Sequence, residues 1–157
     1  MTTPRARPSA RSQRGVYAIE FAMVFLIFFA LLYGAICYGM LFAFRLGLQN
    51  AAEDGARAAL RYQSTYSARA VQAKSIATQG IGWLPGVVTR NVDATVCGVV
   101  GNNCTAPVCG AEWTARCQMV VTVTATDMRK LLPPLPSFAL PDQIVGQASM
   151  LLDGRAP

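Results

Sequence analysis

The residues with the clearest chemical potential lie where a basic segment meets an apolar one. Gly15 directly precedes the apolar residues, and Glu20 is the fifth residue counted from Val16. A cut after Gly15 would create a new ammonium group on Val16, and in a helix Glu20 would lie about 6 Å along the axis from it, at about 1.5 Å per residue. A carboxylate within a membrane costs up to roughly 3 kcal/mol, so we expect Glu20 to have a partner.

Two interpretations of this carboxylate follow from its position. In a chain staggered against an identical or related neighbour, the ammonium of one subunit pairs with Glu20 of the next, because a low-dielectric setting penalises a lone charge. Alternatively, Glu20 lies at the cytoplasmic interface and its side chain reaches toward Arg14 or water. The first interpretation is favoured, since ionisable residues within membrane segments are functional by default.

The chain has five cysteines and no histidine. Cys37 lies in the apolar run, where a thiol packs as a small apolar side chain. The other four, Cys97, Cys104, Cys109 and Cys117, fall within 21 residues and form no Cys-x2-Cys pair. A four-cysteine zinc site is therefore the weaker alternative, and two disulfides in an oxidising compartment are expected. Of the three pairings, adjacency on neighbouring strands favours Cys97–Cys117, with Cys104–Cys109 closing the loop tip.

Nothing in the remaining residues has the spacing of a catalytic site. The absence of histidine excludes a Ser-His-Asp triad, a Cys-His pair and a histidine-ligated metal. Neither a P-loop nor a complete Gly-x-Gly-x-x-Gly motif occurs in the sequence. We therefore expect no enzymatic activity, no cofactor, no metal ion and no small-molecule substrate.

A run of 24 residues without charge extends from Phe21 to Phe44. As a helix it measures about 36 Å, slightly more than a hydrocarbon core of about 30 Å. We therefore predict a leader over residues 1–15 and a transmembrane helix over residues 16–44. A cleaved secretory signal is disfavoured because the apolar run is too long, begins beside Glu20 and lacks a following A-x-A site.

The excess positive charge lies before this span. The net charge is +6, of which four arginines contribute +4 within the first fifteen residues, while the other ten Lys and Arg and eight Asp and Glu give +2. A terminal tag of this kind does not form a basic face, so we expect no nucleic-acid binding. Because only Arg45 follows the span directly, the N-terminus is predicted to be cytoplasmic, with residues 45–157 outside.

Small residues within the span favour lateral packing of helices. Ala30 and Gly34 form one small-x3-small pair, and Ala35 and Gly39 form another. Such pairs let two helices approach closely in a membrane. The alternative is that glycine and alanine are simply common in membrane spans.

The residues after the span predict an outer α+β domain. Residues 45–85 have a helical pattern with a stripe of small apolar residues, so we expect one long helix with a membrane half and an amphipathic outer half; Ser64 and Thr65 could interrupt it. Alternation of apolar and polar residues then predicts three antiparallel strands, with a proline-rich loop before the last. The strands are expected over residues 87–97, 113–126 and 144–152, within a C-terminal domain of residues 86–157. The helical stripe is the expected cover for their apolar face.

At the junction the sequence resembles a known group of proteins. A basic leader ending in Gly15, a Glu at position 20 and an unbroken apolar helix form the pattern of type IV pilin-like proteins. The segment GARAAL, Gly55–Leu60, is similar to the TadE family of tight-adherence (Tad/Flp) pilus assembly proteins. The resemblance covers residues 14–62 best, and a Thr/Val-rich strand near the C-terminus also fits it. It implies a pilin-like arrangement of the long helix on the small sheet.

The resemblance implies a minor pseudopilin with a structural role in building or priming a pilus. The implied partners are a prepilin peptidase that cuts after Gly15, other pilin-like subunits and the pilus assembly platform. The implied location is the bacterial inner membrane, with a periplasmic C-terminal domain; TadE, TadF and entry into the extracellular fibre all stay open. The alternative is an uncleaved single-span protein whose outer domain binds an envelope partner or ligand.

Overall fold

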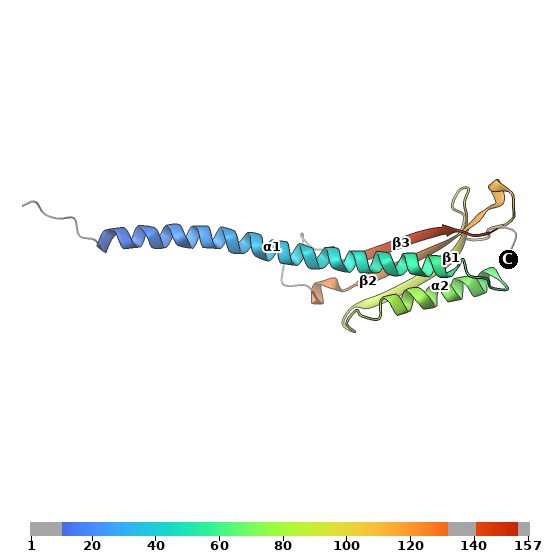
Figure 1. Cartoon of the computed structure of the whole chain (residues 1–157), viewed down its shortest axis with the longest axis horizontal. Helices are drawn as coiled ribbons and strands as arrows, with labels where there is room; N and C mark the ends of the chain where they lie inside the picture. Colours follow the sequence, from blue (N-terminus) through green and yellow to red (C-terminus); the bar gives the residue numbers. More distant parts are fainter. Residues whose placement is uncertain (1–10, 132–140, 154–157) are drawn as a thin grey trace, which may run out of the picture. The chain divides into compact units, whose positions relative to one another are not determined.

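The computed structural model describes residues 11–131 and 141–153, with side chains from residue 15 onward. Its elements are, in order, α1 (Arg11–Ala58), α2 (Tyr66–Gly80), β1 (Thr89–Gly98), the short 3₁₀ helix η1 (Trp113–Ala115), β2 (Cys117–Thr126), the 3₁₀ helix η2 (Met128–Lys130) and β3 (Gln143–Leu151) (Figure 1). The chain divides into two compact units, Met1–Gly39 and Met40–Pro157. Most of the predicted leader and of the proline-rich loop lies outside the described residues.

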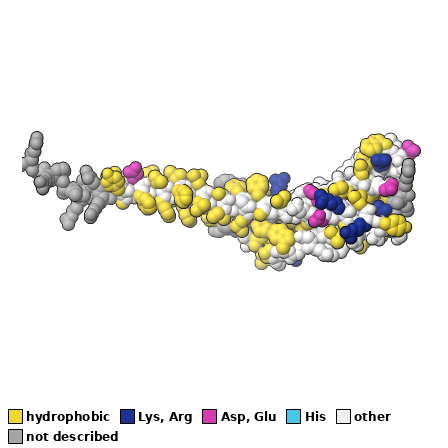
Figure 2. All heavy atoms as spheres, viewed as in Figure 1, with side chains coloured by type: hydrophobic (Ala, Val, Ile, Leu, Met, Phe, Trp, Pro, Cys, Tyr) yellow, Lys and Arg dark blue, Asp and Glu magenta, His cyan; other side chains and the backbone are white. Residues whose placement is uncertain are grey.

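The first unit contains the N-terminal part of α1. This helix begins at Arg11, four residues before the predicted leader ends. Its extent is consistent with the sequence, because no proline interrupts the chain between Pro8 and Pro85. Hydrophobic side chains predominate on the visible face of the coloured part of this helix (Figure 2). From Gly15 onward the helix is long and apolar enough to cross a membrane, which indicates that it anchors the protein there.

An aromatic ladder runs along this part of α1. The rings of Phe21, Phe25, Phe29 and Tyr33 stack at successive centroid distances of 6.0, 6.0 and 6.5 Å. Side chains four residues apart lie one above the other on a helix, which produces the ladder. All three phenylalanines are at least 53% exposed within the chain, so this face is available to lipid or to another helix.

The second unit is built on a three-stranded antiparallel sheet in the order β1-β2-β3. In the register, Thr89 pairs with Thr126, which in turn pairs with Gln143. The predicted α+β class with three antiparallel strands is confirmed. The first and third strands match their predicted ranges to within two residues, whereas β2 begins four residues later than predicted because η1 occupies residues 113–115.

One face of the sheet forms the core with both helices. Along β2 every second residue is buried, as strict alternation predicts for a sheet with one covered face. The central side chains Met119, Val121 and Val123 are completely buried. They pack in one cluster with small residues of α1 and α2, which include Ala52, Ala56, Ala59, Ala73 and Ala77.

The helix expected over residues 45–85 is not continuous: the structure has two helices there, and the possible interruption at Ser64 and Thr65 lies in the break between them. α1 ends at Ala58, and α2 starts after Thr65, whose Oγ1 accepts a hydrogen bond from the Ala68 amide at 3.1 Å. Thr65 therefore acts as an N-cap. The buried Arg69 reaches back from α2, and its Nη1 donates to the Ala59 carbonyl at 3.5 Å. α2 packs on β1 and β2 and so shares the covering of the sheet with α1.

Two glycines of the second unit allow these elements to approach closely. A Cβ added at Gly55 would lie 2.8 Å from the Ala73 carbonyl oxygen and 2.9 Å from the Ala77 Cβ. A Cβ added at Gly146 in β3 would lie 2.5 Å from the Leu48 carbonyl carbon. Both contacts are shorter than packed side chains accept, so α1 rests on α2 and on β3 through backbone surfaces.

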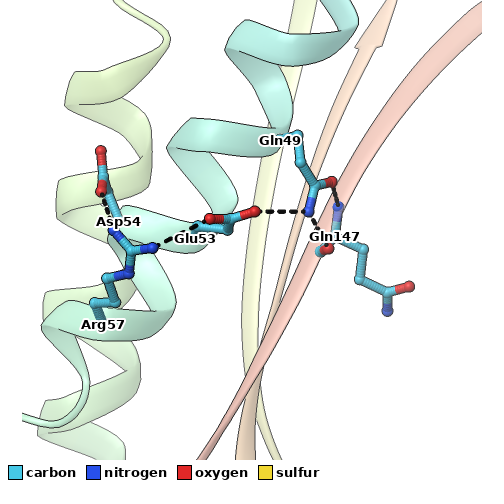
Figure 3. Close-up of polar contacts among 5 residues, drawn as sticks. All are labelled: Gln49, Glu53, Asp54, Arg57 and Gln147. Carbon is cyan, nitrogen blue, oxygen red and sulfur yellow. Dashed lines mark hydrogen bonds and ion pairs between the residues drawn. The ribbon is translucent and has the colours of Figure 1, made fainter.

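A side-chain amide pairs with the edge of the sheet (Figure 3). The Gln49 Nε2 donates to the Gln147 carbonyl at 3.0 Å, and the Gln147 amide donates to the Gln49 Oε1 at 3.1 Å. Gln49 thereby satisfies the outward backbone groups of β3 as a neighbouring strand would. Its Nε2 also lies 3.4 Å from Glu53, which forms an ion pair with Arg57 at 3.3 Å.

A carboxylate joins the first two strands at the end of the sheet where β1 starts. Asp127 has a φ of 65°, a left-handed conformation, and accepts a hydrogen bond from Thr89 Oγ1 at 2.9 Å. Lys130 Nζ lies 3.1 Å from the other carboxylate oxygen. These two contacts favour the charged form, so the pKa of Asp127 is lowered, by the Thr89 hydrogen bond first and by Lys130 second.

Gly146→Ala tests the close contact between α1 and β3. The added methyl group would overlap the Leu48 backbone, so we expect the free energy of unfolding to fall by about 1–3 kcal/mol. Gly86→Ala is the matched control, because a Cβ there meets nothing within 4 Å, and we expect a change within about 0.5 kcal/mol. Chemical denaturation of the full chain in detergent measures both, and equal stability of the two variants would contradict the contact.

Candidate assembly surface

The predicted cleavage and assembly residues all lie on the part of α1 in the first unit. Gly15, Val16 and Glu20 are exposed. Among the side chains that the structure describes, Glu20 forms no ion pair. On an ideal helix Glu20 is about one turn from Val16 and about 40° from it around the axis. The Val16 amine that cleavage would create and the Glu20 carboxylate therefore lie on one side of the helix.

Gly34 lies on the same side of α1 as these residues. At about 100° per residue, it falls in line with Val16 and about 40° from Glu20. Gly39 lies about 100° from Glu20, so the two predicted small-residue pairs do not form one continuous face. Apart from the helix's own backbone, a Cβ at Gly34 or Gly39 would meet no described part of the chain within 4 Å. Both positions are thus open for the approach of another helix.

The aromatic ladder occupies a different side. Its rings lie about 100–220° from Glu20 around the ideal helix. One side of this segment therefore has a carboxylate and a glycine, and the opposite side has stacked rings. Such an arrangement lets a neighbouring helix approach the glycine side closely while bulky rings fill the space on the other.

The disulfides are present, but the favoured pairing is wrong. The structure joins Cys97 to Cys104 and Cys109 to Cys117, while Cys37 stays a free, buried thiol. The register explains the difference, because Cys97 pairs with Gln118, and Cys117 pairs with Gly98. This offset of one residue places the Cys97 and Cys117 side chains on opposite faces of the sheet. With all four thiols oxidised, the zinc alternative loses its ligands.

The described residues offer no metal centre. Within residues 15–131 and 141–153, no three His, Cys, Asp or Glu side chains gather in a group that could hold a metal ion. Residues 132–140 of the predicted proline-rich loop lie outside the described part of the chain. The residues that can be assessed as a site are therefore those along α1.

The comparison with protein families addresses this same helix. The family model for TadE-like proteins matches residues 15–57. The chain is TadE-like over this segment. The resemblance inferred from the junction and from GARAAL is confirmed there, and it suggests a protein associated with Tad pili. No curated protein and no solved structure matches the chain.

The structure explains the end of the TadE-like segment in physical terms. Gly55 and Ala56 are buried where α1 meets α2, so larger side chains would push the helices apart. Arg57 is exposed and pairs with Glu53 and Asp54 on the surface of α1, at 3.3 and 3.7 Å (Figure 3). The Gly-Ala-Arg sequence thus combines a close helix contact with a solvated ion-paired face.

Sequence reasoning missed Gln49 as a structural residue. Its amide pairs with Gln147, which is 98 positions away in the chain. No local motif indicates such a contact, because the pattern depends on the register between α1 and β3. A polar residue beside the buried stripe of α1 was the available signal.

Peptide mapping under non-reducing conditions tests the disulfides. Cuts beside Val100 and Val108, together with a tryptic cut after Arg116, place each of the four cysteines on its own peptide. We then expect the pairs Cys97–Cys104 and Cys109–Cys117. Replacing either pair with serine should lower the free energy of unfolding by about 2–3 kcal/mol, because the closed loops are short. A fragment that links Cys97 to Cys117 would contradict the register.

Proposed function

We propose that this protein is a minor pseudopilin-like assembly protein of a Tad/Flp pilus system. It is inserted in the bacterial inner membrane, with a cytoplasmic leader and a periplasmic outer domain. A prepilin peptidase removes the leader after Gly15, and Glu20 then pairs with the N-terminal amine of an adjacent pilin-like subunit. The TadE-like match over residues 15–57 is the observation that carries this proposal.

The position of the match supports cleavage after Gly15. The matched segment begins at this residue, and it leaves out all four arginines of the leader. Removing them replaces a strongly basic end with one ammonium group on Val16. Because glycine has no side chain, a peptidase pocket that accepts it can be too narrow for any other residue.

The exposure of Glu20 supports a partner in another chain. Its side chain lies in an apolar helix and forms no ion pair with the side chains described in this chain. A carboxylate left alone in the low-dielectric interior of a membrane is costly, and pairing with a cation reduces that cost. The amine on Val16 of a staggered neighbour has the right charge and the right depth. Gly34 on the same side, where an added Cβ would meet nothing within 4 Å, lets that helix approach.

The competing proposal is an uncleaved single-span protein whose outer domain binds an envelope partner or ligand. Under it Arg14 remains in the chain, and Glu20 pairs with it or with interfacial water. The two proposals differ in the covalent structure of the mature protein, so its N-terminus distinguishes them.

The mass of the mature chain tests cleavage. In a host with the matching peptidase, we expect a protein that begins at Val16, and Gly15→Ala should leave the chain at full length. Gly39→Ala is the control, because it adds the same methyl group to another exposed glycine of the helix and should be processed normally. A wild-type chain that keeps Met1 would refute the proposal.

Glu20→Gln tests the charge pair. The substitution keeps the size of the side chain and removes its charge, so membrane insertion should persist. Because losing one partner of a buried pair costs about 3–5 kcal/mol, we expect recovery of the protein with other pilin-like subunits to fall by about a hundredfold or more. Glu53→Gln is the control, since Glu53 pairs with Arg57 on the outer surface of α1. Equal recovery of both variants would exclude a pairing role for Glu20.

A further inference from the structure

We propose that the turn between α2 and β1, with Trp83 at its exposed tip, lies in the interface of the membrane that α1 enters. The outer unit would then bind an anionic lipid surface directly, in addition to being tethered to it. This inference rests on the membrane anchoring of α1 but not on cleavage or on pilus assembly.

The position of Trp83 along α1 is the first observation. Its indole stacks on the ring of Phe44, with centroids 5.5 Å apart and an interplanar angle of 7°. Phe44 is the last residue of the charge-free run, and Arg45 follows it. Because that run is about 36 Å long and a hydrocarbon core is about 30 Å thick, its end falls in the headgroup region. Tryptophan is enriched at that depth in membrane proteins.

A glycine creates the space that the indole occupies. A Cβ added at Gly47 would lie 2.5 Å from the Trp83 ring, so the ring lies flat against the helix backbone. Trp83 is nevertheless 51% exposed, and Val87 on the same turn is 54% exposed. The turn thus presents apolar surface outward at the level where α1 leaves the apolar run.

The turn that carries these residues is held firmly. Leu84 and Val88 are both 3% exposed and anchor it in the core. Arg90 Nη1 donates to the carbonyls of Ile81 and Leu84, each at 3.4 Å. This turn differs from an ordinary polar loop because it contains both buried and exposed apolar residues. Its internal contacts orient Trp83 and Val87 before the turn meets a membrane.

The charges at this end of the sheet suit an anionic surface. The register places the start of β1, the end of β2 and the start of β3 together, and Arg45 and Gln143 line a common hollow. The charged residues described here are Arg45, Arg90, Arg129, Lys130, Asp127 and Asp142. Four cations and two carboxylates give +2, even though Arg129 pairs with Asp142 and Lys130 with Asp127. A net positive rim around apolar side chains is the pattern that anionic membranes attract.

A second tryptophan provides an internal comparison. Trp113 lies in η1, just before β2 begins, whereas Trp83 is near the end of the sheet where β2 finishes. The two ends of β2 are about 30 Å apart, at about 3.4 Å per residue. Trp113 is 61% exposed, similar to Trp83, and has the Arg116 guanidinium 5.3 Å from its ring centroid. The two tryptophans therefore have similar exposed fractions within the chain. They differ in their expected distance from the membrane.

Fluorescence of the full chain in liposomes tests the proposal. Trp113→Phe leaves Trp83 as the single tryptophan, and Trp83→Phe leaves Trp113. The vesicles contain phosphatidylethanolamine and phosphatidylglycerol, with or without lipids brominated just below the headgroup. We expect bromolipid to reduce Trp83 emission about twofold, since the ring is expected at that depth, and to leave Trp113 emission unchanged. Acrylamide in the aqueous phase should quench Trp113 more strongly than Trp83.

Each other outcome overturns the proposal in a recognisable way. If Trp83 is quenched from water as strongly as Trp113, the turn stands clear of the membrane. If Trp83 emission is blue-shifted but insensitive to bromolipid, protein covers it instead of lipid. If neither variant floats with the liposomes in a sucrose gradient, membrane anchoring itself fails, and the proposed function fails with it. Flotation together with a water-exposed Trp83 leaves the proposed function intact and removes only this inference.

Discussion

A single helix, α1, has an apolar part suited to a membrane and an amphipathic part that packs on the sheet. The change between the two parts, at Phe44 and Arg45, determines what the rest of the chain packs against. From Phe21 to Phe44, α1 is apolar on every side, which no water-soluble surface tolerates over this length. Beyond Arg45 its buried residues are confined to a stripe that begins at Leu48. The first part offers most of its circumference to lipid or other helices, although Cys37 is buried within the chain. The second part offers one side to the sheet of its own chain.

Small residues set the geometry of that second part. Gly55 and Gly146 bring α1 within backbone distance of α2 and β3. A three-stranded sheet gives little area to bury, so close approach is the means by which short alanine and valine side chains fill the core without voids. The disulfides add support in the loop between β1 and β2, where Val100, Val108 and Trp113 are exposed instead of packed in the core. The amide of Gln49 supports the outer edge of β3, whose other edge pairs with β2.

The proposed site differs in kind from an enzyme's active site, because it is completed by molecules outside the chain. Glu20 and Gly34 lie on an open side of an apolar helix, and the proposed pairing obtains its strength from the low dielectric constant of the surroundings. The same physical reasoning applies to Trp83, whose exposed ring is unfavourable in water and favourable in a lipid interface. The Glu20 carboxylate is unfavourable in an apolar medium, and the exposed Trp83 ring is unfavourable in water. Each mismatch indicates which partner or medium surrounds the residue.

Local patterns determined much of this protein from the sequence alone. The apolar run, the alternation of Val and Thr in β2 and the Gly15–Glu20 junction each depend on residues close together in the chain, so they predicted the membrane helix, the α+β class and the TadE-like segment. Only the tertiary structure decided the break after Ala58, the disulfide pairs, the Gln49–Gln147 contact and the stacking of Trp83 on Phe44. These features depend on how distant segments align. A shift of one residue between β1 and β2 moves Cys117 to the opposite face from Cys97, and no local pattern contains that shift.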